Sequence, residues 1–154
     1  MRAKEYLREY ERQTYKVRLL EEELTEVNDS IDSLSQYSDG LPKSKTPKDK
    51  VSKLAEKLAD LTAEIAGQRT EALLKKNEVR KTILKIKDTR YIQVLTERYI
   101  LLNRWEQIAV NLNYSWRYAM KIHELALEEV QKIIDEEKLS LIHISEPTRL
   151  LSIS

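Results

Sequence analysis

The stretch that decides the fold runs from Trp105 to Ala126 and reads WEQIAVNLNYSWRYAMKIHELA. Ile108 and Leu112 are four residues apart, which places them on one face of a short predicted helix. The pattern stops at Asn113. The helical spacing then resumes at Ala119, Ile122 and Ala126. The stretch therefore predicts two amphipathic helices joined by a tight turn, which is a helix-turn-helix.

Local signals in and around this stretch agree with that prediction. Ala109 is small at the point where the two helices would cross, and Asn113 suits a left-handed turn position, where asparagine is well tolerated in place of glycine. Ser115 is a good N-cap for the second helix. Asn103 and Glu106 have the spacing of a capping box that would open the first helix.

Length and composition restrict the class of protein. The 154 residues have room for one domain, or for a small domain with an extension, and the scarcity of glycine and proline favours helices over sheet. The absence of cysteine excludes disulfides and thiolate metal sites, and two histidines cannot form a histidine-rich metal site. No apolar run approaches the roughly 20 residues of a membrane span, and the amino terminus lacks a signal peptide's apolar region. We expect an all-α, cytoplasmic protein with no cofactor, no metal and no membrane partner.

Charge is segregated along the chain although the net charge is only +1. Basic residues dominate from Lys75 to Lys87, where Glu78 is the one acidic residue, and acidic residues dominate from Glu124 to Glu137. This polarity suits a protein that presents one basic face to nucleic acid. Two ordinary solvated helix surfaces would produce the same pattern, so charge alone does not choose between the readings.

The first third of the chain predicts a long helix with a heptad seam. Gln13 is the polar interruption in this seam, and its exposed positions are rich in charged residues. The seam consists of Tyr6, Tyr10, Gln13, Val17, Leu20, Leu24, Val27, Ile31 and Leu34. A helix of this composition is not stable alone, so it requires a partner along its seam.

A second heptad helix follows a loop predicted at residues 36–46, where Asp39-Gly40 and two prolines interrupt the helical pattern. Thr46 is the expected N-cap and Pro47 suits the first helical position. Gly67 and Gln68 predict a bend or looser packing near its middle. Its seam consists of Val51, Leu54, Leu58, Leu61, Ile65, Ala72, Val79, Ile83 and Ile86.

Two domains are expected from these patterns: residues 1–86, with the two heptad helices, and residues 88–138, with the helix-turn-helix. The heptad helices could fold back as an antiparallel hairpin or pair between two chains as a homodimer, and the sequence does not separate these. Asp88 is a plausible cap for a third helix from Thr89 to Leu102, with Leu95, Tyr99 and Leu102 in the core. The helix that follows Ser115 is expected to continue through Ile134.

The segment RYILLNRWEQIAVNLNYS, from Arg98 to Ser115, followed by His123 and Ala126-Leu127, carries a resemblance to a known group. Together with Tyr6-Leu7, DGLP at 39–42 and DKV at 49–51, it resembles small phage and prophage proteins of Gram-positive bacteria. The carboxyl half of those proteins is similar to region four of sigma factors, and late transcription activators of the RinA and ArpU type belong to this neighbourhood. The resemblance implies a DNA-binding transcription regulator that acts in the cytoplasm of a bacterial host cell.

The sequence departs from that group at two turns. LLN at 101–103 stands where such proteins often carry a glycine-containing turn, and Asn113 replaces the usual glycine. The carboxyl-terminal residues do not belong to this resemblance. LSLIHISEPTR, at 139–149, resembles the in-frame translation of a transposase-type sequencing adaptor. We therefore expect residues 139–154 to be non-biological, and we give them no functional role.

The predicted DNA-contacting residues lie at the start of the second motif helix, whose first turns would enter the major groove. Arg117 can donate to guanine, Lys121 can reach a base or phosphate, and Arg104 can touch the DNA backbone. The full set consists of Arg104, Ser115, Trp116, Arg117, Tyr118 and Lys121. Trp116 and Tyr118 could also pack against protein. Trp105 is expected to be a packing residue, and His123 is expected to be half-exposed and not catalytic.

The leading hypothesis is a sequence-specific regulator that binds double-stranded promoter DNA, alone or with host RNA polymerase, as a homodimer through its heptad helices. A packaging component resembling a small terminase subunit is an alternative, although such proteins typically place the DNA-binding part first. A coiled-coil scaffold without DNA binding is another. The sequence has no phosphate loop, no clustered carboxylate pair and no nucleophile beside a base, so we do not expect an enzyme.

Overall fold

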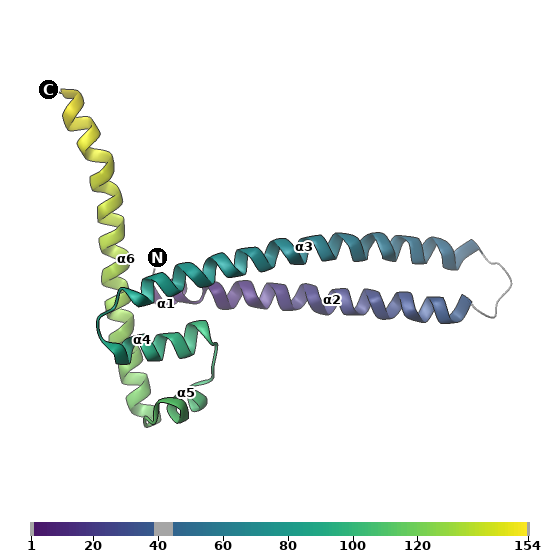
Figure 1. The fold of residues 1–154 in the computed structure, drawn as a ribbon, viewed down its shortest axis with the longest axis horizontal. Coiled ribbons are helices and arrows are strands. Elements are labelled where there is room, and N and C mark those ends of the chain that lie inside the picture. The colour runs from purple at the N-terminus through teal and green to yellow at the C-terminus, as the bar shows by residue number, and fades with distance from the viewer. Residues whose placement is uncertain (1, 39–44, 154) are drawn as a thin grey trace. The chain divides into compact units, whose positions relative to one another are not determined.

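The computed structural model describes the backbone of residues 2–38 and 45–153 and the side chains of residues 2–36 and 48–141. All its regular elements within these ranges are helices, which confirms the predicted all-α class. Figure 1 shows the order along the chain. The elements are α1 (Ala3–Leu7), α2 (Glu9–Ser38), α3 (Lys45–Leu84), α4 (Thr89–Leu95), the π-helical η1 (Thr96–Ile100), α5 (Trp105–Leu112) and α6 (Trp116–Ile153). The predicted loop at 36–46 falls partly outside the described residues, because 39–44 are not among them.

Helices α2 and α3 lie side by side as a hairpin within one chain (Figure 1). Every residue of the two predicted seams is buried or half-buried, and Val17, Val27, Leu61 and Ile65 are the most buried of those between residues 12 and 74. Burying one such side chain contributes about 1.5–3 kcal/mol, whereas an exposed ion pair such as that between Lys57 and Glu23 contributes about 0–1 kcal/mol. The apolar seam therefore holds the hairpin together.

One polar pair interrupts the apolar seam. The side-chain amide of Gln13 donates to the side-chain oxygen of Gln68 and also lies 3.3 Å from the backbone oxygen of Gln68. The two glutamines thus satisfy each other across the hairpin, and Gln68 occupies a seam position. Helix α3 is continuous through Gly67, where an added Cβ would meet nothing within 4 Å.

The remaining residues form a second compact unit, made from the chain up to Glu11 together with the chain from Lys75 onward. Residues 12–74 form the hairpin unit. This division differs from the boundary expected near residue 87, because α1 and the end of α3 belong with α6. One apolar cluster joins these segments and consists of Ala3, Leu7, Val79, Ile83, Ile86, Leu95, Tyr99, Ile100, Ala126, Val130 and Ile134.

Hydrogen bonds attach α1 to both of its neighbours in this unit. The backbone nitrogen of Ala3 donates to the side-chain oxygen of Gln131 on α6, at 2.8 Å. The hydroxyl of Tyr6 lies 2.9 Å from that of Thr82 on α3. Thr82 is buried, so this contact and its bond to the backbone oxygen of Glu78 satisfy its hydroxyl. A helix of only five residues is therefore fixed by tertiary contacts.

Asp88 caps α4 as predicted, because its carboxylate accepts from the backbone nitrogen of Arg90 at 2.9 Å. The predicted helix from Thr89 to Leu102 ends earlier, at Ile100, after the π-helical turn η1. Leu102 then adopts a positive φ of 57°. Leu95 and Tyr99 are buried as expected, whereas Leu102 is only half-buried. At its far end, α6 continues as one helix through the adaptor-like residues to Ile153.

The glutamine pair leads to a test of the hairpin. Gln13→Leu would leave the Gln68 amide without its partner in a half-buried seam, so we expect the free energy of unfolding to fall by about 1 kcal/mol. Gln13→Leu combined with Gln68→Leu should recover that loss but relax the register, producing a mixture of oligomers. Urea denaturation and sedimentation measure these effects, with Lys16→Leu at an exposed position as the control. Equal stability of the single and double variants would contradict the pairing.

Candidate nucleic-acid interface

The turn between α5 and α6 has the geometry that the sequence predicts. Asn113 is in the left-handed region, with φ 56° and ψ 44°. Its backbone nitrogen donates to the oxygen of Val110 at 3.2 Å, and that of Tyr114 donates to the oxygen of Ala109 at 2.9 Å. These bonds satisfy the carbonyls at the end of α5, so α5 stops and the chain reverses within three residues.

Ser115 is the N-cap of α6, as predicted from the sequence. Its hydroxyl oxygen accepts from the backbone nitrogen of Tyr118 at 3.1 Å. Tyr118 is half-buried, and its ring meets the ring of Tyr114 edge-on with centroids 4.8 Å apart. Both side chains thus help to fix the start of α6, whatever else they contact.

Two faces of α6 carry different residue types. Ala119, Ile122 and Ala126 are almost fully buried and face the core. Arg117 and Lys121 are exposed and lie four residues apart, on the side of the helix opposite that core. The same outward face continues with the exposed Glu124 and Glu128. On this face, the positive charge of the first two turns is therefore followed by negative charge at Glu124 and Glu128.

The other predicted residues lie at the edges of this surface. Trp116 is 57% exposed, which is unusual for so large an apolar side chain. Arg104 is exposed at the N-cap of α5, and no described contact joins its side chain to the α6 residues. The predicted capping box is wrong: helix α5 begins one residue later, because the amide of Asn103 donates to Glu97 at 2.5 Å instead of capping α5.

Arg90 was not predicted from the sequence and belongs to this region. Its guanidinium donates to the hydroxyl of Tyr118 at 2.9 Å and forms an ion pair with Asp88 at 2.9 Å. Arg90 therefore lies beside the first turn of α6, although 28 residues separate it from Tyr118. Only the packing of α4 against α6 brings them together, so no local pattern could have identified it.

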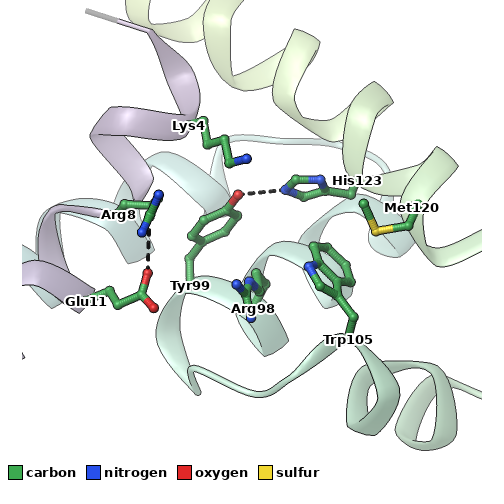
Figure 2. A pocket seen from close by; sticks show the side chains of 8 residues that line it. All are labelled: Lys4, Arg8, Glu11, Arg98, Tyr99, Trp105, Met120 and His123. Atoms are coloured by element: carbon green, nitrogen blue, oxygen red, sulfur yellow. Dashed lines mark hydrogen bonds and ion pairs between the residues drawn. The ribbon is translucent and has the colours of Figure 1, made fainter. Parts of the chain in front are cut away.

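Behind α6, an aromatic cluster fixes α5 against η1 and α6 (Figure 2). Trp105 meets the ring of His123 edge-on, with centroids 4.7 Å apart, and the Arg98 guanidinium lies over the Trp105 ring at 5.4 Å. Trp105 is thus a packing residue, as predicted. The prediction of a half-exposed His123 is wrong, because this side chain is 5% exposed and lies 2.6 Å from the Tyr99 hydroxyl.

Burial sets the ionisation of this pair. Desolvation, followed by the nearby charges of Lys4 and Arg98, lowers the pKa of His123 to about 4. Desolvation also raises the pKa of Tyr99 to about 12. Both groups are therefore neutral at pH 7, and their hydrogen bond joins two uncharged rings.

No group of three histidine, aspartate or glutamate side chains within the described residues gathers as a metal site would require. None of the helices in the described part of the chain combines the length and apolar character of a membrane span. No protein-family model, curated protein or solved structure matches this chain.

The left-handed turn predicts a specific mutational pattern. Asn113→Val should lower the free energy of unfolding by about 1–2 kcal/mol, because a β-branched residue is strained at positive φ. Asn113→Gly should leave it unchanged or slightly higher. Thermal unfolding followed by circular dichroism measures both, and Asn28→Val, at an exposed position on α2, is the control. Equal losses at 28 and 113 would contradict a strained turn.

The buried histidine predicts a pH dependence of stability. Because the pKa of His123 is about 4 in the folded chain and about 6.5 when unfolded, only the unfolded chain takes up this proton between those values. The free energy of unfolding should fall as pH drops from 6.5 to 4, by up to ~3 kcal/mol from this group.

His123→Gln is the matched variant, since its side-chain oxygen still accepts from Tyr99 but the amide does not titrate. Every other titratable group is the same in both proteins, so the difference between them isolates His123. Urea denaturation across this pH range provides the measurement. A difference in stability between the two proteins that stays constant from pH 7 to 4.5 would sink the assignment.

Proposed function

We propose that the chain is a sequence-specific DNA-binding transcription regulator of the phage or prophage type that its resemblance implies. The α5–turn–α6 segment, residues 105–126, would act as a helix-turn-helix, with α6 as the recognition helix in the major groove. The observation that supports this most is the outward placement of Arg117 and Lys121 on the first two turns of α6. The start of this helix is capped by Ser115.

The chemistry of these two residues suits base and phosphate contacts. An arginine at this position can donate two hydrogen bonds to N7 and O6 of guanine, and a lysine one turn later can reach a phosphate or a base. The two acidic residues that follow on the same face, Glu124 and Glu128, would repel DNA phosphates. We therefore infer that only the amino-terminal end of α6 enters the groove.

Flanking residues would fix the position of α6 on the duplex. Arg90, held beside Tyr118, and Arg104, exposed at the start of α5, are suited to backbone phosphates, which position a protein without reading sequence. Trp116, with its exposed indole, would contact a thymine methyl or a sugar. The Ser115 hydroxyl caps α6 by accepting from the Tyr118 backbone nitrogen, and its own hydrogen can still be donated to a phosphate.

The proposal includes two kinds of protein partner. Host RNA polymerase would hold the regulator on promoters where its own affinity is low. A second copy would read a second half-site. The seams of α2 and α3 cover each other within one chain, so pairing of two copies through the same seam would require the hairpin to open.

Selection of bound sequences from a random DNA pool, with and without host RNA polymerase, tests the proposal. An enriched motif with the protein alone establishes a sequence-specific regulator, and enrichment only with polymerase establishes a co-regulator. No enrichment in either case sinks the proposal. A ring-sized oligomer in light scattering would then favour a packaging component, and a smaller species without salt-dependent DNA binding would favour a scaffold.

Single substitutions separate base reading from phosphate contact. Arg117→Ala should weaken binding to the selected site by about 1–3 kcal/mol and relax specificity at one base pair. Lys121→Ala should weaken binding to all sequences and reduce the slope of log K against log salt by about 1. Glu124→Gln should strengthen binding. Fluorescence anisotropy at several salt concentrations measures these effects, with Lys53→Ala, an exposed residue of the hairpin, as the control.

A further inference from the structure

We propose that the compact unit binds a small oxyanion, a phosphate or carboxylate group, in a cavity between Lys4, Arg98 and the Tyr99–His123 pair. The cavity has a volume of about 150 Å³ and its walls come from α1, the start of α2, η1, α5 and α6 (Figure 2). All these segments belong to one compact unit. The site is separate from the outward face of α6, and the proposal does not depend on DNA binding.

Unpaired positive charge faces this cavity. Of the four charged side chains in its wall, Arg8 and Glu11 form an ion pair at 3.3 Å and offset each other. Arg98 donates to the backbone oxygen of Asn103 at 3.0 Å, but no carboxylate among the described residues pairs with it. Lys4 is exposed and is likewise without a carboxylate partner among those residues. Lys4 and Arg98 therefore border the cavity as cations without a carboxylate partner, whereas the Glu11 carboxylate in its wall is paired with Arg8.

The position of Lys4 is suited to closing on a ligand. Figure 2 shows its ammonium group directed toward the Tyr99 hydroxyl, with Arg98 on the far side of that ring. Two like charges that border one cavity repel each other, and an anion between them removes that repulsion. The flexible stem of Lys4 allows its charge to follow the ligand, while the bond from Arg98 to Asn103 holds the second cation in place.

The Tyr99–His123 pair can supply a further donor. With a proton on Nε2, His123 donates to the Tyr99 oxygen, and the hydroxyl hydrogen is then free to point into the cavity. With the proton on Nδ1, the Tyr99 hydroxyl donates to His123 instead. An oxyanion would therefore select the first tautomer, without any change in the charge of either ring.

The volume limits the class of ligand. Pockets for drug-sized molecules are typically about 300–1,000 Å³, and a water molecule occupies about 30 Å³ in the liquid. A cavity of about 150 Å³ thus has room for a phosphate ion or a short carboxylate, and not for a nucleotide. The buried His123 reaches it from the inner side of α6, whereas Arg117 is exposed on the outward face, so a DNA strand bound to Arg117 would not also fill it.

Trp105 lines the cavity and provides the reporter. The sequence has two tryptophans, so the full chain carrying Trp116→Phe has one indole, and that indole borders the proposed site. We would titrate this protein with inorganic phosphate, and separately with malonate, while sodium chloride keeps the ionic strength constant. The expected result is a saturable change in Trp105 fluorescence with at least one anion. The anion with the lower dissociation constant shows whether phosphate or carboxylate is the preferred group.

Variants at Lys4 decide between a site and general ionic effects. In the same background, Lys4→Met should weaken binding at least tenfold, Lys4→Arg should restore it, and Lys81→Met, an exposed lysine outside the cavity, should leave it unchanged. Circular dichroism establishes that each variant is folded. Absence of saturation with both anions would overturn the proposal, as would Lys4→Met binding like the parent or Lys81→Met losing affinity equally.

Discussion

The buried face of α6 is the surface on which the compact unit is assembled. Ala126 and Val130, both fully buried, lie one turn apart and meet residues from α1, the end of α3 and α4 in one apolar cluster. Their small side chains allow several helices to approach the same stretch of α6 closely. These neighbours come from two segments far apart in the chain, so the buried face of α6 packs against both at once.

The direction of Arg117 and Lys121, the proposed DNA-contacting residues, is a consequence of that packing. Burial of Ala119 and Ile122 fixes the rotation of α6 about its own axis. Arg117 and Lys121 are thereby turned outward, while the Ser115 cap and the Arg90–Tyr118 bond fix the first turn. Because the buried side of α6 sets their direction, the charges of Arg117 and Lys121 remain available for a partner.

Features that depend on local chemistry could be predicted from the sequence, and those that depend on tertiary contacts could not. The heptad seams, the left-handed Asn113 and the Ser115 cap follow from spacing and from neighbouring residues. The capping prediction at Asn103 failed because its side chain turns to Glu97, which accepts from the Asn103 amide and lies outside α5. The burial of His123 and the pairing of Gln13 with Gln68 depend on residues 24 and 55 positions away. Helical periodicity contains no information about such partners.

The unit that holds α6 is discontinuous in sequence, since its first segment precedes the hairpin and its last follows it. The bond between Ala3 and Gln131 spans 128 positions. On the ribosome, α2 and α3 can pair as soon as both have emerged, because their contacts are local to the hairpin. The residues of α1 must wait until Gln131 has been synthesised, so this compact unit closes after the hairpin has formed. The two units of the chain therefore complete their packing in sequence, the hairpin first.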